Sequence, residues 1–437
     1  CGFNLGVVFP NLVEAFKENK VSMERIDEAL ERIFMTRMKL GILGDADDNP
    51  YNQIPYSVVD SDEMKKLNER AAEKSVVLLK NKDNILPLDK NKIKTIAVLG
   101  PNANNRRSLD GNYEGTSSRY ITVLEGIQDY VGDDVRVLYS EGCHLFRDQI
   151  NQMAVKCDRV AEIKEICSES DVVIAVMGLD ATLEGEDGDT GSDYGMGDKP
   201  YLHLPGIQTE VLKIAKESGK PVILVNMTGS AMTLNWEEEN LDGIIQGWYP
   251  GARGGKAIAR LLFGEADFEG KLPVTFYRTM EELPEFTDYS MKNRTYRYMK
   301  NEALYPFGYG LSYTKFEYEN TVLIEDADHV DIKTIIKNTG KMDGTETVQV
   351  YVGAREEWVP NPQLKKIKKV FLKKGESKEI EVILTKEDFY VFDESGNPVI
   401  SQEYDIYIGG SQPDSRSEKL LERKPVHMEV KECFMQE

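Results

Sequence analysis

Seven carboxyl side chains gather in one short stretch of the chain, directly after its most apolar run. The run is Val172-Val173-Ile174-Ala175-Val176-Met177, and it ends at Gly178. Uninterrupted β-branched residues between a charge and a glycine predict a strand buried on both faces. Open α/β sheets place ligands beyond the carboxyl ends of such strands. The acidic side chains that follow are therefore candidates for proton transfer: Asp180, Glu184, Glu186, Asp187, Asp189, Asp193 and Asp198.

The composition of this loop is compatible with three functions. A solvated acidic loop is the simplest, because charge runs are usually surface features. A calcium site is the second, since Asp187, Asp189 and Asp193 resemble alternating oxygen ligands, although their spacing departs from that of an EF-hand loop. General acid catalysis is the third. In that chemistry a carboxyl protonates a leaving oxygen and later activates water, with a second carboxylate across the substrate.

Two glycine-rich turns elsewhere in the chain do not match a phosphate-binding loop. Residues 100–104 and 251–255 lack the GxxxxGK[ST] and GxGxxG patterns, so they predict tight turns. The four histidines are scattered, without the spacing of zinc ligands. The sequence therefore predicts no cofactor and no metal at the site.

The overall charge narrows the classes of partner. The chain has 437 residues and a formal net charge of −21. A nucleic-acid interface needs clustered Lys and Arg, and an anionic membrane surface attracts cations, so neither partner is expected. A neutral substrate such as a sugar is compatible with this charge, and so is a surface that is acidic for solubility alone.

Cysteine usage and hydropathy bear on the compartment. The five cysteines are odd in number and widely spaced, with no CxxC pair, which favours free thiols in a reducing, cytoplasmic compartment. No run reaches the roughly 18 apolar residues of a membrane span, and no signal peptide is visible. Because the chain begins with Cys1 rather than methionine, we expect it to be the interior of a longer protein.

Periodicity predicts an α/β region over 57–280. Residues 1–56 are predicted to be helical and then a linker, with Ser22 capping a helix whose apolar stripe needs a covering surface. A helix over 61–80 follows. Strands alternating with helices over 154–168 and 207–218 then imply a mostly parallel sheet covered on both faces. The expected strands are 95–99, 135–139, 172–177, 222–225 and 243–247, with a sixth at 271–276, where Pro273 favours an edge.

The pattern changes after a polar, Tyr-rich connector over 281–304. Short runs of alternating polarity, separated by glycine turns, predict an all-β sandwich of fibronectin type III character over 305–437. The fold class is thus a six-stranded, mostly parallel α/β sandwich followed by an all-β sandwich.

Seven segments, in order along the chain, resemble glycoside hydrolase family 3 in its β-xylosidase and β-glucosidase branch. Each is weak alone, and together they span most of the chain. They are 37–41 (RMKLG), 75–81 (SVVLLKN), 85–88 (ILPL), 96–103 (IAVLGPNA), 248–251 (WYPG), 270–276 (GKLPVTF) and 305–313 (YPFGYGLSY). The resemblance implies a (β/α)8 barrel, then an α/β sandwich, then a fibronectin type III-like domain. This chain resembles the carboxy-terminal portion, with only the end of the barrel domain in residues 1–56.

The resemblance also implies a retaining mechanism with two carboxyls. The acid/base segment of the family is similar to residues 177–186, and Glu184, six residues after Gly178, falls at the catalytic position. Glu186 is its local rival. Asp198 and Lys199 align with a substrate-contacting Gly-Asp-Arg element, where Lys199 replaces the usual Arg and cannot offer a bidentate fork.

The family nucleophile, a barrel aspartate in a Ser-Asp-Trp-like setting, has no counterpart in this chain. The stretches 192–194 (SDY) and 287–289 (TDY) imitate the motif but follow no predicted strand. Without a nucleophile about 5–5.5 Å from the acid/base, retaining hydrolysis cannot run, so the chain alone is expected to be inactive.

We therefore expect the chain to belong to an exo-acting β-glycosidase that hydrolyses terminal β-D-xylosyl or β-D-glucosyl residues. Its partners would be a β-linked oligosaccharide or aryl glycoside and the missing barrel domain, and homo-oligomer formation is left open. The opening Cys1-Gly2 and the Leu183-Glu184-Gly185-Glu186 loop favour the xylosidase branch. The alternative is a noncatalytic carbohydrate-binding or scaffolding fragment.

Overall fold

The computed structural model describes residues 5–44, 48–151, 153–188, 192–356, 358–431 and 434. The chain divides into two compact units, between Met64 and Lys65, and each unit is described by itself. The predicted domain limits at 56, 280 and 304 stay predictions.

The first unit is helical, as predicted. Helix α1 spans Leu5–Lys17 and α2 spans Met23–Lys39. The side chain of Ser22 accepts a hydrogen bond from the backbone N–H of Arg25, which caps α2 as its sequence suggested. Four apolar side chains spaced three or four residues apart on α2 are exposed: Leu30, Ile33, Phe34 and Met38.

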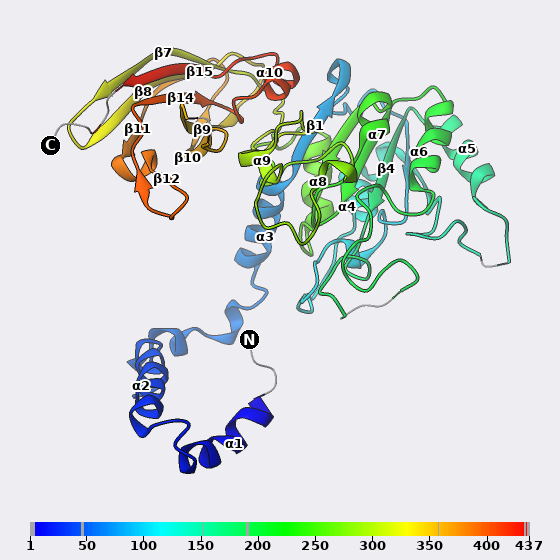
Figure 1. Ribbon diagram of the computed structural model, residues 1–437. Helices are drawn as coiled ribbons and strands as arrows, with labels where there is room; N and C mark the ends of the chain where they lie inside the picture. The colour runs from blue at the N-terminus through cyan, green and yellow to red at the C-terminus, as the bar shows by residue number, and fades with distance from the viewer. Residues whose placement is uncertain are drawn as a thin grey trace. The chain divides into compact units, whose positions relative to one another are not determined.

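A six-stranded sheet forms the centre of the second unit (Figure 1). Its strand order is β1-β6-β5-β4-β2-β3, in which only β1 runs antiparallel to its neighbour. Every residue of β4 is buried, which agrees with its continuous apolar sequence. The strands are β1 Val77–Asn81, β2 Thr95–Leu99, β3 Arg136–Ser140, β4 Val172–Gly178, β5 Val222–Met227 and β6 Gly243–Gln246.

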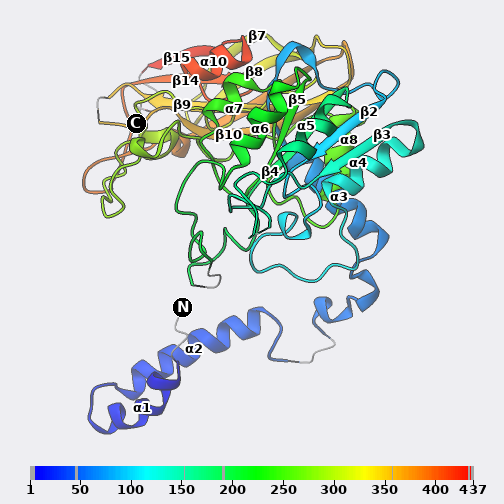
Figure 2. The same ribbon diagram turned by 90° about the vertical axis from the view of Figure 1, so that its right-hand side faces the viewer.

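Helices cover both faces of this sheet, as Figure 2 shows. Alternate residues of β4 enter two different apolar clusters: Val173 and Met177 pack with α5 and α6, whereas Ile174 and Val176 pack with α4 and α8. This two-sided burial produces the predicted doubly covered sheet. The helices are α3 Asp62–Ser75, α4 Val123–Val131, α5 Val160–Ser168, α6 Gln208–Glu217, α7 Asn235–Asn240, α8 Gly254–Leu262 and the short α9 Thr295–Tyr298.

Two predicted elements of this region are wrong. The helix expected over 61–80 ends at Ser75, and the sixth strand is β1, not residues 271–276. The run Val76-Val77-Leu78-Leu79 is buried and fits either element by periodicity, so pairing with β6 decides its conformation. Within 271–276 only Phe276 forms an isolated bridge, to Tyr305.

The carboxy-terminal part is an antiparallel β-sandwich, as predicted. One sheet has the order β10-β9-β14-β15, the other β11-β8-β7, and β12 and β13 form a small pair. Strict alternation of burial along β8 places one face in the core. The elements are β7 Phe316–Glu325, β8 His329–Asn338, β9 Gly344–Ala354, β10 Gln363–Leu372, β11 Ser377–Thr385, β12 Val391–Phe392, β13 Pro398–Val399, β14 Glu403–Gly409, α10 Ser415–Leu421 and β15 Val426–Lys431.

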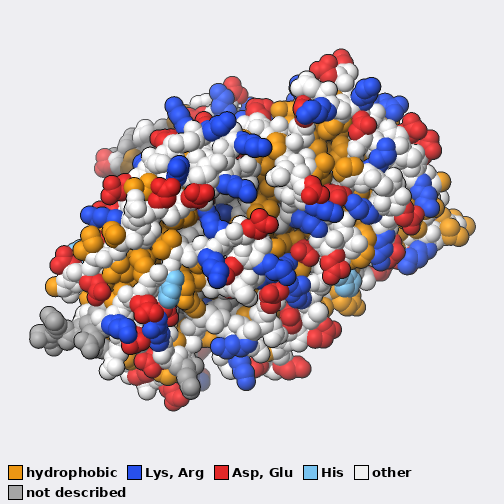
Figure 3. All heavy atoms as spheres, turned by 90° about the horizontal axis from the view of Figure 1, so that it is seen from above, with side chains coloured by type: hydrophobic (Ala, Val, Ile, Leu, Met, Phe, Trp, Pro, Cys, Tyr) orange, Lys and Arg blue, Asp and Glu red, His pale blue; other side chains and the backbone are white. Residues whose placement is uncertain are grey.

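Buried polar contacts join the β-sandwich to the α/β part of the same unit. Arg416 of α10 donates hydrogen bonds to the carbonyl oxygen of Leu304, at 3.1 Å, and to a carboxylate oxygen of Glu238, at 2.9 Å. The Gln349 amide donates to the carbonyl oxygen of Gly308 at 2.9 Å. The surface seen in Figure 3 intersperses Lys and Arg with Asp and Glu side chains. Among the described residues, no helix is long and apolar enough to cross a bilayer.

Candidate active site

The candidate catalytic loop begins where β4 ends, at the carboxyl edge of the sheet. Gly178 has φ +127°, and a Cβ at this position would lie 2.1 Å from the carbonyl oxygen of Met227 in the neighbouring strand. Only glycine therefore fits this turn. The chain leaves the sheet here and enters the acidic loop that the sequence singled out.

Asp180 organises the turn that presents Glu184. Its buried carboxylate accepts hydrogen bonds from the N–H of Thr182 at 2.9 Å and from the Asn105 amide at 2.8 Å. The backbone N–H of Glu184 donates to the carbonyl oxygen of Asp180 at 3.0 Å. Asp180 is thus a structural acceptor rather than a free acid, because its oxygens are occupied by donors from its own loop and from Asn105.

Three donors hold the partly exposed Glu184 carboxylate. Its Oε2 accepts from the backbone N–H of Gly229 at 2.7 Å and from the Tyr249 hydroxyl at 2.7 Å. Its Oε1 accepts from the Ser230 hydroxyl. Gly229 and Ser230 follow β5, and Tyr249 follows β6, so the carboxyl edges of three adjacent strands converge on this one side chain.

The Tyr249 loop has an unusual backbone. Trp248 has φ +58°, which is rare for a large residue, and its indole N–H donates to the carbonyl oxygen of Ser75 at 3.0 Å. Burial, followed by the Glu184 charge, raises the pKa of the Tyr249 hydroxyl well above its usual value. Tyr249 therefore remains a protonated donor at any working pH.

The charge of Glu184 also acts on a second tyrosine, Tyr194. Burial, and then the charge of Glu184, raise the pKa of Tyr194 to about 12. Its hydroxyl oxygen is buried without a hydrogen-bond partner in the described part of the chain.

The rival carboxyl, Glu186, has a different setting. It is exposed, and one of its oxygens accepts a hydrogen bond from the Tyr113 hydroxyl at 3.0 Å. The backbone beside it is fixed, because Gly185 N–H donates to the carbonyl oxygen of Gly197 at 2.8 Å. Glu186 can reach solvent, whereas Glu184 is fixed by its neighbours.

The two predicted substrate-contacting residues, Asp198 and Lys199, differ in their exposure to solvent. Asp198 is exposed. The Lys199 ammonium donates to the carbonyl oxygen of Ala231 and lies 3.4 Å from the Met232 sulfur. Burial lowers the pKa of Lys199 to about 8, partly offset by the nearby Glu184 charge. Lys199 is thus partly buried against Ala231 and Met232, where the charge of Glu184 acts on it, whereas Asp198 lies at the surface.

Sequence reasoning missed the residues that contact Glu184. Ser230 is 46 positions and Tyr249 is 65 positions away from it. Tyr249 lies in the family-like stretch 248–251, and the ends of β5 and β6 were the signal that could have indicated both residues.

The two stretches that imitate a nucleophile motif lie at the surface. Asp193 is exposed and pairs with Arg147 at 3.4 Å. Asp288 is exposed and accepts a hydrogen bond from the Ser290 N–H at 2.9 Å. Within the described part of the chain, neither directly follows a strand. Asp189, one of the three ligands of the calcium interpretation, lies outside the described residues.

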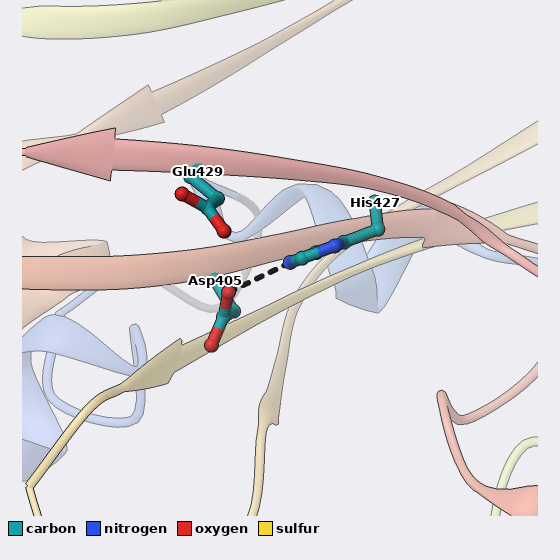
Figure 4. A group of neighbouring side chains, drawn as sticks. All are labelled: Asp405, His427 and Glu429. Atoms are coloured by element: carbon teal, nitrogen blue, oxygen red, sulfur yellow. Dashed lines mark hydrogen bonds and ion pairs between the residues drawn. The ribbon is translucent and has the colours of Figure 1, made fainter.

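Among the described residues, one group has metal-ligand chemistry, and it lies in the β-sandwich. Asp405, His427 and Glu429 offer ligand atoms within 4.8 Å of one another (Figure 4). Arg355 already supplies a cation there, with its guanidinium 3.0 Å and 2.5 Å from the two Asp405 oxygens and 2.6 Å from Glu429. A metal ion would compete with this guanidinium, so the group is better described as an ion-pair network.

Comparison with known proteins defines the class of this fold. The model of the glycosyl hydrolase family 3 C-terminal domain matches residues 76–313, and that of a fibronectin type III-like domain matches residues 346–412. The chain belongs to glycosyl hydrolase family 3. The predicted family resemblance and fold class are confirmed.

Individual relatives agree with this assignment. The chain is 28% identical over 563 residues to a xylan 1,4-beta-xylosidase of Xylanibacter ruminicola, covering 96% of this chain and 65% of that protein. It is 32% identical to a beta-xylosidase of Formosa agariphila, covering 92% and 55%. The chain thus spans between about half and two thirds of these relatives.

Solved structures give the same result. A β-glucosidase from Erythrobacter marinus superposes with a TM-score of 0.81 at 27% identity, covering 97% of this chain and 57% of that one. A beta-glucosidase from Listeria innocua in complex with isofagomine superposes with a TM-score of 0.79 at 26% identity, covering 96% and 57%.

Proposed function

We propose that this chain supplies the general acid/base carboxyl of a retaining, exo-acting β-glycosidase, and that Glu184 is that carboxyl. The substrates would carry terminal β-D-xylosyl or β-D-glucosyl residues. The similarity to proteins named β-xylosidase and β-glucosidase supports the substrate class. The nucleophile is assigned to a (β/α)8 barrel outside this chain.

The observation that carries the proposal is the set of donors on Glu184. A general acid/base must be satisfied both as a carboxylate and as a neutral acid. Two of its three donors are the hydroxyls of Ser230 and Tyr249, and a hydroxyl can donate or accept. Glu184 can therefore change protonation state without leaving a buried partner unsatisfied.

The chemistry follows in two steps. Glu184 protonates the glycosidic oxygen as the bond between that oxygen and the sugar breaks. The barrel aspartate then forms a covalent bond to the sugar. Glu184, now a carboxylate, then removes a proton from the water that releases the sugar.

The proposal includes Asp198 and Lys199 as substrate-contacting residues. Asp198 is exposed and can accept a hydrogen bond from a sugar hydroxyl. To contact the sugar, the Lys199 ammonium would have to give up its hydrogen bond to the Ala231 carbonyl oxygen. The charges of Lys199 and Glu184 also act on each other.

The test uses Glu184→Gln and, as a matched control two residues away, Glu186→Gln, both in the full-length enzyme. We expect Glu184→Gln to lower kcat on xylobiose by about 10²–10⁴-fold. Activity on a 2,4-dinitrophenyl β-xyloside, which needs little acid assistance, would fall far less, and azide would restore turnover as glycosyl azide.

Unchanged turnover in Glu184→Gln would refute the assignment. If Glu186→Gln showed the pattern instead, the acid/base would be Glu186. Calorimetry of this chain with xylose, glucose and xylobiose addresses the noncatalytic alternative, since tight binding by this chain alone would favour a binding module.

A further inference from the structure

The two oxygens of Glu184 are not equivalent. Oε2 accepts two hydrogen bonds, from the Gly229 N–H and the Tyr249 hydroxyl, each at 2.7 Å. Oε1 accepts one, from the Ser230 hydroxyl. These partners come from the ends of two different strands, so the asymmetry is built into the sheet edge.

A proton on Oε2 would conflict with its partners. The Gly229 N–H can only donate, and a protonated carboxyl oxygen is a weak acceptor. The Tyr249 hydroxyl would have to reverse at the same time. A proton on Oε1 requires only that the Ser230 hydroxyl turn from donor to acceptor, while Oε2 keeps both of its hydrogen bonds as the carbonyl oxygen of the acid.

We infer that Oε1 is the oxygen of Glu184 that carries and delivers the proton, and that Tyr249 is the positioning residue that reserves Oε2 for anchoring. This inference rests on the proposed function of Glu184 and assigns a direction to it. In the first step the Oε1–H bond breaks as an O–H bond forms on the glycosidic oxygen, which keeps the electron pair of its broken bond to the sugar. In the second step a water proton returns to Oε1 while the water oxygen forms a bond to the sugar and the bond between the sugar and the barrel aspartate breaks, its electron pair staying on the aspartate.

The surroundings fix this arrangement. A Cβ on Gly229 would lie 3.2 Å from Oε2 of Glu184 and 3.0 Å from the Tyr249 ring, so a side chain at Gly229 would crowd both partners. The Ser230 carbonyl oxygen accepts a hydrogen bond from the Thr228 hydroxyl at 2.8 Å. The Gln246 amide, at the end of β6, donates to Thr228 Oγ1 at 3.0 Å and so connects β6 to the loop after β5.

The first experiment is infrared difference spectroscopy of this chain in acid, with Glu184→Gln subtracted to isolate the Glu184 carboxyl band. If Oε2 is the carbonyl oxygen of the neutral acid, Tyr249→Phe removes one of its hydrogen bonds and shifts the C=O band to higher frequency. Ser230→Ala leaves the band in place, because Ser230 contacts the hydroxyl oxygen. Tyr139→Phe on β3 and Ser395→Ala in the β-sandwich are the remote controls.

The opposite pattern, with a shift in Ser230→Ala and none in Tyr249→Phe, overturns the inference, and so does the absence of a shift in both. Circular dichroism and thermal unfolding establish that each variant is folded. Because this readout needs no catalysis, it can fail while Glu184→Gln still abolishes turnover, and it can succeed while the catalytic assignment fails.

A second experiment measures the leaving-group dependence of the full-length enzyme. Tyr249→Phe is expected to lower kcat about tenfold on xylobiose and less than twofold on a 2,4-dinitrophenyl β-xyloside, and to move the alkaline limb of the kcat/KM profile to higher pH. Equal losses on both substrates, with an unmoved limb, would show a merely structural role and overturn the positioning assignment.

Discussion

The side-chain amide of Gln208 hydrogen-bonds to both backbone groups of Gly178. Its Oε1 accepts from the Gly178 N–H at 2.7 Å, and its Nε2 donates to the Gly178 carbonyl oxygen at 2.8 Å. The pairing of β4 with β2 ends at Ala175, so Gln208 takes the place of a missing strand beside Gly178. A side chain thereby extends the sheet to the point where the catalytic loop begins.

Replacing the Gln208 amide should lower the stability of the folded chain. In Gln208→Leu, both backbone groups of Gly178 and the Leu145 carbonyl oxygen, which Nε2 also contacts at 2.7 Å, lose their partner in a fully buried site. We expect the free energy of unfolding to fall by about 3 kcal/mol, measured by urea denaturation. Gln128→Leu on the exposed side of α4 is the control, with an expected change within about 0.5 kcal/mol. Equal values for the two variants would contradict the role of Gln208.

Gly178 itself tests how tightly the turn is packed. Gly178→Ala combines a left-handed φ of +127° with a Cβ only 2.1 Å from the Met227 carbonyl oxygen, so the backbone must move. Gly219→Ala has φ +72° but nothing within 4 Å, and it isolates the conformational cost. We expect about 1 kcal/mol of destabilisation for Gly219→Ala and more than about 3 kcal/mol for Gly178→Ala, both measured by thermal and urea unfolding. Similar losses would show that the turn can relax.

The sequence was sufficient to predict the strand that ends at Gly178, because seven consecutive buried positions require apolar residues. It also located the acidic loop, since a glycine and a charge cluster follow directly. It could not assign Val77–Asn81, where an apolar run fits a helix end as well as an edge strand and only pairing with β6 decides.

The contacts of Glu184 could not be predicted for a related reason. The hydroxyls of Ser230 and Tyr249 meet it only because β5 and β6 lie next to β4 in the sheet. Strand order is a property of the whole domain, whereas periodicity reports on one segment at a time. The motif around Tyr249 was visible in the sequence, but its partner was not.

Lys199 should make stability depend on pH. Its pKa is about 8 in the folded chain, against an ordinary value of 10.5, because burial disfavours the ammonium. Below pH 8 the lysine is charged in both states and the cost of burying it is fully present. Between pH 8 and 10.5 the unfolded state binds more protons, so the stability of the folded state rises with pH.

Urea unfolding of the natural chain and Lys199→Met at pH 7.5 and pH 10.5 tests this dependence. The difference in unfolding free energy, natural chain minus variant, should increase by about 2 kcal/mol across that interval, after allowance for partial exposure of the side chain. The difference between Lys199→Arg and Lys199→Met should stay constant over the same interval, because the guanidinium stays charged throughout. A constant difference would show that the ammonium is solvated.

The ion-pair network of the β-sandwich should make stability depend on pH in the acidic range. Arg355 hydrogen-bonds to Asp405 and Glu403 and holds the pKa of each carboxyl below its usual range. Arg355→Met removes that cation. The stability advantage of the natural chain over the variant should be present at neutral pH, where both carboxylates are ionised. It should be lost as the pH falls below the usual carboxyl range and through their lowered pKa values, because protonated carboxyls no longer need the guanidinium.

The same substitution should expose a metal site. With the guanidinium gone, Asp405, His427 and Glu429 keep ligand atoms within 4.8 Å of one another, which suits Zn²⁺. We expect ZnCl₂ at about 1 mM, in excess of a micromolar Kd, to raise the Tm of Arg355→Met. The Tm of the natural chain should stay unchanged. His427→Ala combined with Arg355→Met removes one ligand and should abolish the shift. An equal zinc-dependent rise in the natural chain would mean that the metal displaces Arg355, and that the group is a cation site in its own right.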